Sequence, residues 1–316
     1  MNRESFNLSS PSSLHDSNPP VWLPLAPWGF VILWSAGYGV AKMCLEDTTP
    51  LNLLAMRFVF TSLVLLIPVL IWRLPMPSPG HWRHIFVGAI TIHVAHFGMI
   101  YGGLSLGASA GILALFAASQ PMLVEVAASI WRRRLPSPLL AVGLVVGMAG
   151  AVYVIIARGE FSGDALLGVI MGFVAVIALS AGTAYERFYT PPGHRVSNYF
   201  MQYVMAMTVA VPVALIVEGV HINPTLNLGL GIAYLVLGNA VTGIFLLLTM
   251  VRFGALSRVT SVMFLVPGLG ALIAWLVVGE VMPPSAWPGI FLAGAGVLIV
   301  LYGEQICRYS RTVFHR

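Results

Sequence analysis

The sequence contains very few charged residues. Only 9% of its 316 residues are Asp, Glu, Lys or Arg, whereas 58% are hydrophobic. A soluble domain carries about 25% charged residues, because water must hydrate its surface. A protein embedded in a bilayer can instead expose apolar side chains to lipid. The shortage of charge therefore excludes a soluble globular protein and predicts an integral membrane protein.

Cysteines and cofactor motifs are also scarce. The two cysteines, Cys44 and Cys307, lie at opposite ends of the chain, which argues against a disulfide framework and against a metal cage. No phosphate-binding glycine loop is present, so ATP is not expected to drive the protein. The segment Gly107–Gly111 matches the spacing of a nucleophile elbow, but it stands at the start of a predicted helix and not in a strand-to-helix turn. We therefore predict no enzyme, no metal and no cofactor.

Long apolar runs are what the sequence has in abundance. The hydrocarbon core is about 30 Å thick and a helix rises about 1.5 Å per residue, so a span needs roughly 20 apolar residues. This length predicts an all-α integral membrane protein with ten transmembrane helices. They are expected near residues 24–43, 50–72, 84–104, 107–131, 138–157, 164–186, 196–218, 227–251, 256–279 and 285–304.

Arginines gather in alternate loops between these spans. Cytoplasmic loops are enriched in Lys and Arg, so the distribution predicts which loops are inside. The predicted inner loops contain Arg73, Arg83, Arg132, Arg133, Arg134, Arg187, Arg195 and Arg252. The predicted outer loops are mainly acidic, with Arg158 as their one arginine. We predict a multi-pass protein of the inner cell membrane with a disordered cytoplasmic tail at 1–22 and a basic cytoplasmic tail at 306–316.

The two halves of the chain share a pattern of residues at a constant offset of 146. The matching pairs are Pro121 and Pro267, Arg134 and Glu280, Pro138 and Pro284, Gly143 and Gly289, and Gly150 and Gly296. Five helices in each half is an odd number, so the second half must be inverted relative to the first. Inverted repeats underlie alternating access in many secondary transporters. We predict repeats at 23–158 and 159–305, with a central cavity where they meet near the bilayer midplane.

Several segments resemble the drug/metabolite transporter superfamily, EamA type. The segments are Leu33-Trp34-Ser35 through Lys42, Arg57-Phe58, and Gly254 through Pro267 to Gly279-Glu280 and Pro284. The resemblance implies ten helices, a cavity lined mainly by helices 1, 3, 4, 6, 8 and 9, and export or exchange of small metabolites. The chain departs from the family at Arg134, because the first half often carries a Glu there.

Away from the ends of the predicted spans, two full charges remain, Arg57 and Glu125. An ionisable group in the bilayer costs about 2.5–3.5 kcal/mol on insertion scales, so it usually faces protein or water. Arg57 is expected either to snorkel or pair with an outer carboxylate, or to hold a substrate carboxylate in bidentate fashion. Glu125 is expected either to neutralise part of the Arg132–Arg134 cluster or to act as a proton-coupling carboxylate.

Polar and aromatic side chains near the predicted midplane are candidates for a substrate site. These candidates are Trp34, Tyr38, His93, His96, Gln120, Asn239 and Thr242. Aromatic walls with a few polar groups suit a small amphipathic solute such as an amino acid, although each residue alone also suits helix packing. The two histidines could carry protons. Pro121 and Pro267 break the helical hydrogen-bond ladder, so we predict hinges at both.

The leading functional hypothesis is a secondary exporter or exchanger of a small organic metabolite, with membrane lipid and the substrate as its partners. A nucleotide-sugar or other phosphorylated-metabolite exchanger is an alternative within transport, although it should require several cavity cations, and the candidates are Arg57 and Lys42. From another class, a passive channel or a non-transporting scaffold remains open. No nucleic acid is expected as a partner, and the choice between monomer and homodimer is left open.

Overall fold

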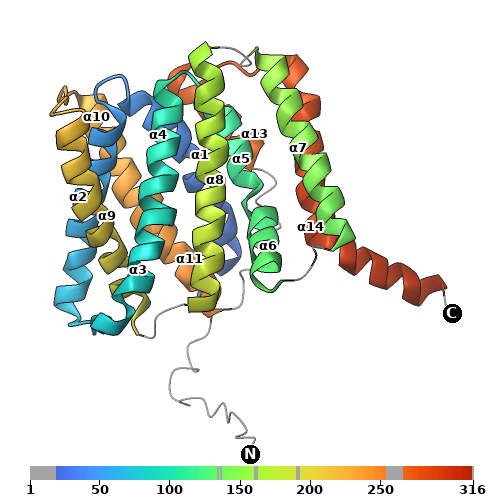
Figure 1. The fold of residues 1–316 in the computed structure, drawn as a ribbon, viewed down its shortest axis with the longest axis horizontal. Coiled ribbons are helices and arrows are strands. Elements are labelled where there is room, and N and C mark those ends of the chain that lie inside the picture. The colour runs from blue at the N-terminus through green and yellow to red at the C-terminus, as the bar shows by residue number, and fades with distance from the viewer. Residues whose placement is uncertain are drawn as a thin grey trace, which may run out of the picture.

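The structure is a computed structural model that describes residues 19–133, 135, 137–159, 163–189, 193–253 and 266–314, without the side chains of 251, 252, 267 and 301–314. Within these ranges the regular elements are helices, and they run side by side as a bundle (Figure 1). An isolated antiparallel bridge joins Thr48 to Ile222. The prediction of an all-α protein is confirmed for this part of the chain.

The first half contains seven α-helices and one π-helix, η3. They are α1 (Ala26–Cys44), α2 (Pro50–Ile71), α3 (Trp82–Gly88), η3 (Ala89–Ala95), α4 (His96–Ser105), α5 (Ala110–Ala118), α6 (Gln120–Trp131) and α7 (Pro138–Arg158). The second half contains six described α-helices and the π-helix η4. They are α8 (Gly163–Tyr189), α9 (Arg195–Val217), α10 (Leu226–Ala233), η4 (Tyr234–Thr242), α11 (Gly243–Arg252), α13 (Val266–Val278) and α14 (Trp287–Phe314).

Several of these helices, alone or joined end to end through a π-helix, are long and apolar enough to cross a bilayer. Among the described residues seven helices meet that criterion, or eight if the bent pair α5–α6 counts as one span. Two shorter apolar helices occupy Gly268–Val278 and Pro284–Val300. Large apolar side chains are exposed on the outside of the bundle, including Ile71 at 69% and Ile216 at 83%. Such a surface requires lipid, so this is a multi-pass membrane protein.

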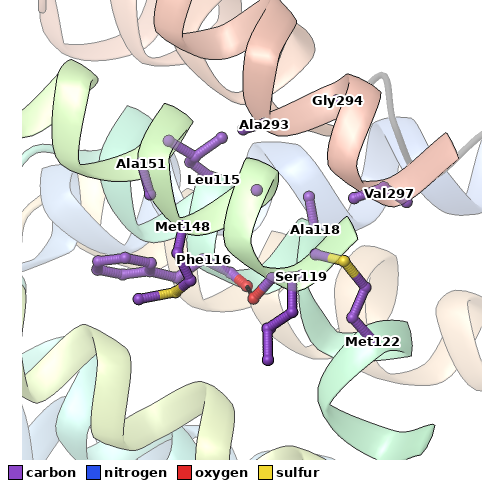
Figure 2. Close-up of a pocket in the computed structure, with 12 residues that line it drawn as sticks. Leu115, Phe116, Ala118, Ser119, Met122, Met148, Ala151, Ala293, Gly294 and Val297 are labelled. Carbon is purple, nitrogen blue, oxygen red and sulfur yellow. Dashed lines mark hydrogen bonds between the residues drawn. The ribbon is translucent and has the colours of Figure 1, made fainter. Parts of the chain in front are cut away.

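The predicted span 107–131 is wrong in one respect, because it is not a continuous helix. It is divided into α5 and α6, which meet at Ser119 with a bend of 45°. Pro121 stands in the first turn of α6, where it has no N–H to donate to the preceding turn. A small apolar cavity of about 20 Å³ lies beside the break. Figure 2 shows side chains around this cavity, among them Ser119, Met122 and Ala293.

Two further spans are interrupted by π-helical turns. In one, η3 separates α3 from α4; in the other, η4 separates α10 from α11. A π-bulge widens the helix and shifts the side chains that follow it, and such bulges are frequent at functional sites. His93 lies in η3 and Asn239 lies in η4. Both of these predicted site residues are therefore carried by irregular helical turns.

Glycines allow α7 and α14 to pack with their backbones in contact, at one edge of the bundle (Figure 1). A Cβ atom added at Gly143 would lie 2.6 Å from the carbonyl oxygen of Gly296, and one added at Gly150 would lie 2.6 Å from that of Gly289. The order of these contacts shows that the two helices are antiparallel. Small residues of this kind bring membrane helices together by close packing, because lipid gives no hydrophobic drive for association.

Candidate functional site

The buried side chain of Arg57 forms the centre of the candidate site. It projects from α2 and is only 2% exposed. One terminal nitrogen donates to the hydroxyl of Tyr101 over 2.7 Å, and the other donates to Oδ1 of Asn239, also over 2.7 Å. The guanidinium carbon lies 3.9 Å from the centre of the Phe97 ring. Arg57 therefore joins α2 to α4 and to η4.

Asn239 is held in the orientation that Arg57 requires. Its Nδ2 donates to the carbonyl oxygen of Leu33 over 2.9 Å, which turns Oδ1 toward the guanidinium. The hydroxyl of Tyr234 donates to the same carbonyl over 2.9 Å. Gly37 leaves the space for this arrangement, because a Cβ there would lie 2.7 Å from Nδ2 of Asn239. The backbone of α1 thus fixes the amide that binds the arginine.

No carboxylate pairs with Arg57 in the part of the chain that the structure describes. Of the three outer carboxylates that could have paired with it, Glu46, Asp47 and Glu280, the last accepts from Lys42 over 2.8 Å and from Arg158 over 2.9 Å. Asp47 accepts from Asn223 over 3.2 Å. The hydroxyl and amide around Arg57 carry no compensating charge, and a buried charge without a counter-ion is costly. The site is therefore electrostatically complementary to an anion.

A small pocket opens beside the guanidinium. It is lined by Trp34, Gly37, Tyr38, Arg57, Phe97, Ile100, Tyr101 and Asn239. Three of its buried polar atoms make no well-formed hydrogen bond: Nε1 of Trp34, the hydroxyl oxygen of Tyr38 and Nε of Arg57, although the Trp34 and Tyr38 side chains lie close to each other. All three can donate a hydrogen bond, and buried donors are normally satisfied. Their convergence favours a ligand that supplies acceptor oxygens.

The pocket is nearly closed in this conformation. Its cavity volume is about 20 Å³, which is room for a water molecule and not for a metabolite. A solute larger than water therefore requires the helices around Arg57 to move apart before it can bind.

The two histidines of the third predicted span are buried and have different partners. Nε2 of His93 lies 3.1 Å from Oε1 of Gln202, whereas Nδ1 of His96 lies 3.1 Å from the carbonyl oxygen of Ala175. The second ring nitrogen of each has no partner. Neither ring lines the pocket beside Arg57, but His93 packs on Phe97, with 6.5 Å between the ring centres.

Three other predicted site residues lie away from the pocket. Gln120 stands at the start of α6 and donates to Thr183 over 3.3 Å. Thr242 is exposed and donates to the carbonyl oxygen of Leu237 over 2.7 Å. Glu125 is about half exposed and pairs with Arg187 over 2.9 Å; of the predicted cluster, Arg132 and Arg133 are described and form no ion pair with it, whereas Arg134 lies outside the described residues. The structure therefore does not bring these three side chains together with Arg57.

The structure describes the surroundings of one predicted hinge, Pro121, more fully than those of the other, Pro267. Pro121 stands at the break between α5 and α6. Pro267 lies in the first turn of α13, but its side chain and residues 254–265 fall outside the described residues. Motion at either position stays a prediction.

Sequence reasoning missed Phe97, Tyr101, Gln202, Tyr203 and Glu186. The repeat offset of 146 could have found one of them, because it relates Arg57 to Tyr203 just as it relates His93 to Asn239. Glu186 was overlooked because it falls at the end of the predicted span 164–186, whereas α8 continues to Tyr189.

A network of ionic contacts lies at the opposite end of α1 from the N-terminus. Besides its ion pairs with Lys42 and Arg158, Glu280 accepts from the backbone N–H of Ala110 over 3.2 Å. Its side chain is 10% exposed. A single carboxylate thus ties the ends of α1 and α7 and the start of α5 to the segment after α13.

Comparisons with known proteins agree with this description. A family model described as "EamA-like transporter family" matches residues 25–156 and again 166–302. An uncharacterized transporter, YvbV, of Bacillus subtilis (strain 168) is 24% identical over 276 residues, covering 85% of this chain and 88% of its own. An uncharacterized inner membrane transporter, YedA, of Escherichia coli (strain K12) is 23% identical over 291 residues, covering 90% and 92%.

Two further similarities concern a named pump and a solved structure. A Salmonella typhimurium protein named "Probable amino-acid metabolite efflux pump" is 22% identical over 292 residues, covering 89% of this chain and 95% of its own. A crystal structure described only as that of a protein matches with a TM-score of 0.59 and 20% identity, covering 88% of this chain and 96% of that chain. At that identity the solved structure supports the fold alone.

Proposed function

The chain belongs to the EamA-like transporter family, and from that premise we propose that it is a secondary exporter or exchanger of small carboxylate-bearing metabolites such as amino acids. Membrane transport is the activity that the family and its named relatives share. The substrate class and the mode of transport are the parts that we propose.

The observation that carries this proposal is the buried guanidinium of Arg57 beside two further donors, from Trp34 and Tyr38, that lack a well-formed hydrogen bond. A carboxylate has two acceptor oxygens and one negative charge, so it suits a guanidinium flanked by Nε1 of Trp34 and the hydroxyl of Tyr38. The aromatic rings of Phe97 and Tyr101 offer an apolar wall for the rest of the molecule. The amino-acid metabolites in the name of the Salmonella relative are consistent with such a solute.

A phosphorylated substrate is less well supported. Lys42, the second cation that was considered for a phosphate site, forms an ion pair with Glu280. Arg57 is the one cationic side chain that lines the described pocket. A nucleotide sugar would bring more negative charge than one guanidinium can balance.

We further propose ten transmembrane helices in two inverted repeats. The glycine contacts between α7 and α14 are reciprocal, since Gly143 meets Gly296 while Gly150 meets Gly289, and the offset of 146 exchanges the two contacts. A two-fold relation between the halves requires such reciprocity. The π-helices η3 and η4 also begin 145 residues apart. The shorter apolar segments Gly268–Val278 in α13 and Pro284–Val300, which includes the first part of α14, supply the ninth and tenth spans.

Alternating access then requires one side of the cavity to open while the other is closed. Under the topology that the arginines predict, with both termini in the cytoplasm, the Glu280 network lies on the outer side. Pro121 and the cavity beside the α5–α6 break are a suitable hinge on the inner side. We propose that the contacts of Glu280 with Lys42, Arg158 and Ala110 hold the outer side closed.

Replacing Glu280 by glutamine is expected to favour the outward-open state. Both ion pairs would be lost, and each 1.4 kcal/mol of lost stabilisation would shift the populations by about tenfold. A cysteine introduced at the buried pocket residue Ile100 should then react faster with a membrane-impermeant maleimide added outside. Glu46→Gln, an exposed acid on the same side, is the control. Equal labelling in Glu280→Gln and wild type would contradict this gate.

The proposed function is tested by counterflow in liposomes that contain the purified protein. Labelled L-phenylalanine, L-leucine and L-threonine would be taken up against an excess of the same unlabelled solute inside. Saturable exchange of any of them supports the proposal. Unsaturable flux would indicate a channel. If folded protein gives no exchange of amino acids, the amino-acid assignment fails. If phosphorylated metabolites are not exchanged either, a non-transporting scaffold is favoured.

A further inference from the structure

A second buried polar cluster lies close to Arg57 and has no part in the carboxylate pocket. Glu186 near the end of α8 accepts a hydrogen bond from Nε2 of Gln202 on α9. Oε1 of the same amide lies 3.1 Å from Nε2 of His93 in η3. Three helices thus contribute one continuous chain of hydrogen bonds, which we name the Glu186–His93 chain.

The Glu186–His93 chain of hydrogen bonds fixes which nitrogen of His93 carries the proton. A carboxylate accepts hydrogen bonds, so Gln202 directs its NH₂ to Glu186 and its carbonyl oxygen to His93. His93 must therefore donate from Nε2. In the neutral ring Nδ1 is then a bare acceptor, and this atom is buried without a partner. A proton that binds Nδ1 gives an imidazolium whose charge is offset by Glu186 through the amide.

The Glu186–His93 chain and the pocket beside Arg57 are in contact with the same aromatic side chain, Phe97. The ring of His93 lies 4.3 Å from that of Tyr203 and 6.5 Å from that of Phe97, centre to centre. Phe97 also carries the guanidinium of Arg57 on its face. The titratable or charged groups around the chain are Arg57 on α2, His96 and Tyr101 on α4, and Arg195, Tyr199 and Tyr203 on α9. Of these groups Arg57 is the permanent charge nearest to the imidazole.

The two sites also occupy equivalent positions in the repeat. The offset of 146 turns the pair Arg57 and Asn239 into the pair Tyr203 and His93, and both pairs are in contact. Each pair joins one helix to a π-helical turn of the other half. Arg57 corresponds to Tyr203 and Asn239 corresponds to His93, so the equivalent contacts carry a cation with an amide in one case and a tyrosine with a histidine in the other.

We propose that the Glu186–His93 chain is a proton-binding site that is coupled to the substrate site, so that one proton travels with each substrate molecule whose carboxylate is bound at Arg57. The inference rests on the proposed function, because it needs a carboxylate at Arg57. Without substrate, the charge of Arg57 opposes a second positive charge on His93. A carboxylate at Arg57 removes that repulsion, and His93 then takes a proton from water at Nδ1. The proton leaves again when the substrate leaves.

The test is a pH measurement during efflux. Liposomes that contain the protein, L-phenylalanine and the pH dye pyranine are diluted into buffer without the amino acid. Wild type is expected to make the lumen alkaline as the amino acid leaves. Glu186→Gln is expected to lose this signal while retaining labelled counterflow, which needs no net proton movement. Glu125→Gln is the matched control and should keep both.

The outcomes separate this inference from the proposed function. The proton-site proposal is contradicted if wild type exchanges L-phenylalanine without a pH change, or if Glu125→Gln loses the signal while Glu186→Gln keeps it. In either case the proposal that the protein transports amino acids is unaffected. If wild type exchanges no amino acid, the proposed function itself fails.

A second measurement does not depend on transport. ¹⁵N NMR of histidine-labelled protein, with the His93 signal assigned from the variant His93→Gln, should show a neutral His93 that is protonated at Nε2. Protonation at Nδ1 would overturn the inference.

Discussion

Replacing Arg57 by glutamine is expected to weaken the affinity for amino acids strongly, so that saturable exchange needs much higher concentrations, while the protein remains folded. Glutamine can still donate to Tyr101 or Asn239, but it brings no positive charge and cannot hold both carboxylate oxygens. Truncating one partner of a buried, hydrogen-bonded charge pair costs about 2–5 kcal/mol. This corresponds to a loss of ~30-fold or more in affinity. Labelled counterflow over a range of concentrations measures the effect.

Two further variants make that result specific. Arg57→Lys keeps the charge without the planar fork, so it should recover part of the exchange with a raised KM. Arg83→Gln removes an exposed arginine and should exchange like wild type. Full exchange by Arg57→Gln would show that the buried arginine serves only to join the helices.

Replacing Gly296 by alanine is expected to lower the stability of the protein far more than the same change at Gly294. The two glycines are two residues apart in α14 and so point in different directions. A Cβ at position 296 would lie 2.5 Å from the carbonyl oxygen of Gly143, whereas one at position 294 would meet nothing within 4 Å. Overpacking costs about 1–3 kcal/mol. Alanine has a higher helix propensity than glycine by about 1 kcal/mol. Propensity alone would therefore make Gly296→Ala more stable, which is opposite to the expected result.

The proposed repeat extends this prediction to the other half. Gly150→Ala should destabilise the protein about as much as Gly296→Ala, because its Cβ would lie 2.6 Å from the carbonyl oxygen of Gly289. Thermal unfolding of the purified variants in detergent gives Tm for each. Equal Tm values for Gly294→Ala and Gly296→Ala would contradict the backbone contact between α7 and α14.

The fold followed from the sequence to a large extent because a bilayer imposes simple rules. Apolar length predicted the spans, so the second helix, expected at 50–72, is found at Pro50–Ile71. The same rules do not predict where a helix is bent or interrupted by a π-turn. Apolar length cannot distinguish a straight helix from one bent at Ser119, nor can it reveal the π-turns η3 and η4, because these depend on backbone hydrogen bonds and not on hydropathy.

The candidate site was predictable where helix periodicity decided the question. Trp34 and Tyr38 are four residues apart, so they share a face of α1, and both line the pocket with Arg57 and Asn239. Thr242 is exposed although it lies three residues from Asn239, since a π-turn does not keep the α-helical period. Whether the lining residues bind substrate stays a prediction.

The charges were the hardest part to predict. Glu125 and Glu186 each lie within a helical span, but Glu125 pairs with Arg187 at the surface, whereas Glu186 bonds to Gln202. Sequence alone gives the depth of a side chain in the membrane, not the helix that it faces. The partner of a carboxylate is set by how the two halves pack together, and that information lies in tertiary contacts.

The most direct test of the central claim is a cycle of two ligands and two proteins. L-Phenylalanine and L-phenylalaninamide differ in the carboxylate, and wild type and Arg57→Gln differ in the guanidinium. Inhibition of counterflow gives an affinity for each of the four combinations, from which the coupling energy follows. The account predicts that wild type strongly prefers the acid and that Arg57→Gln loses this preference. An equal preference for the acid in both proteins would contradict recognition of the carboxylate by Arg57.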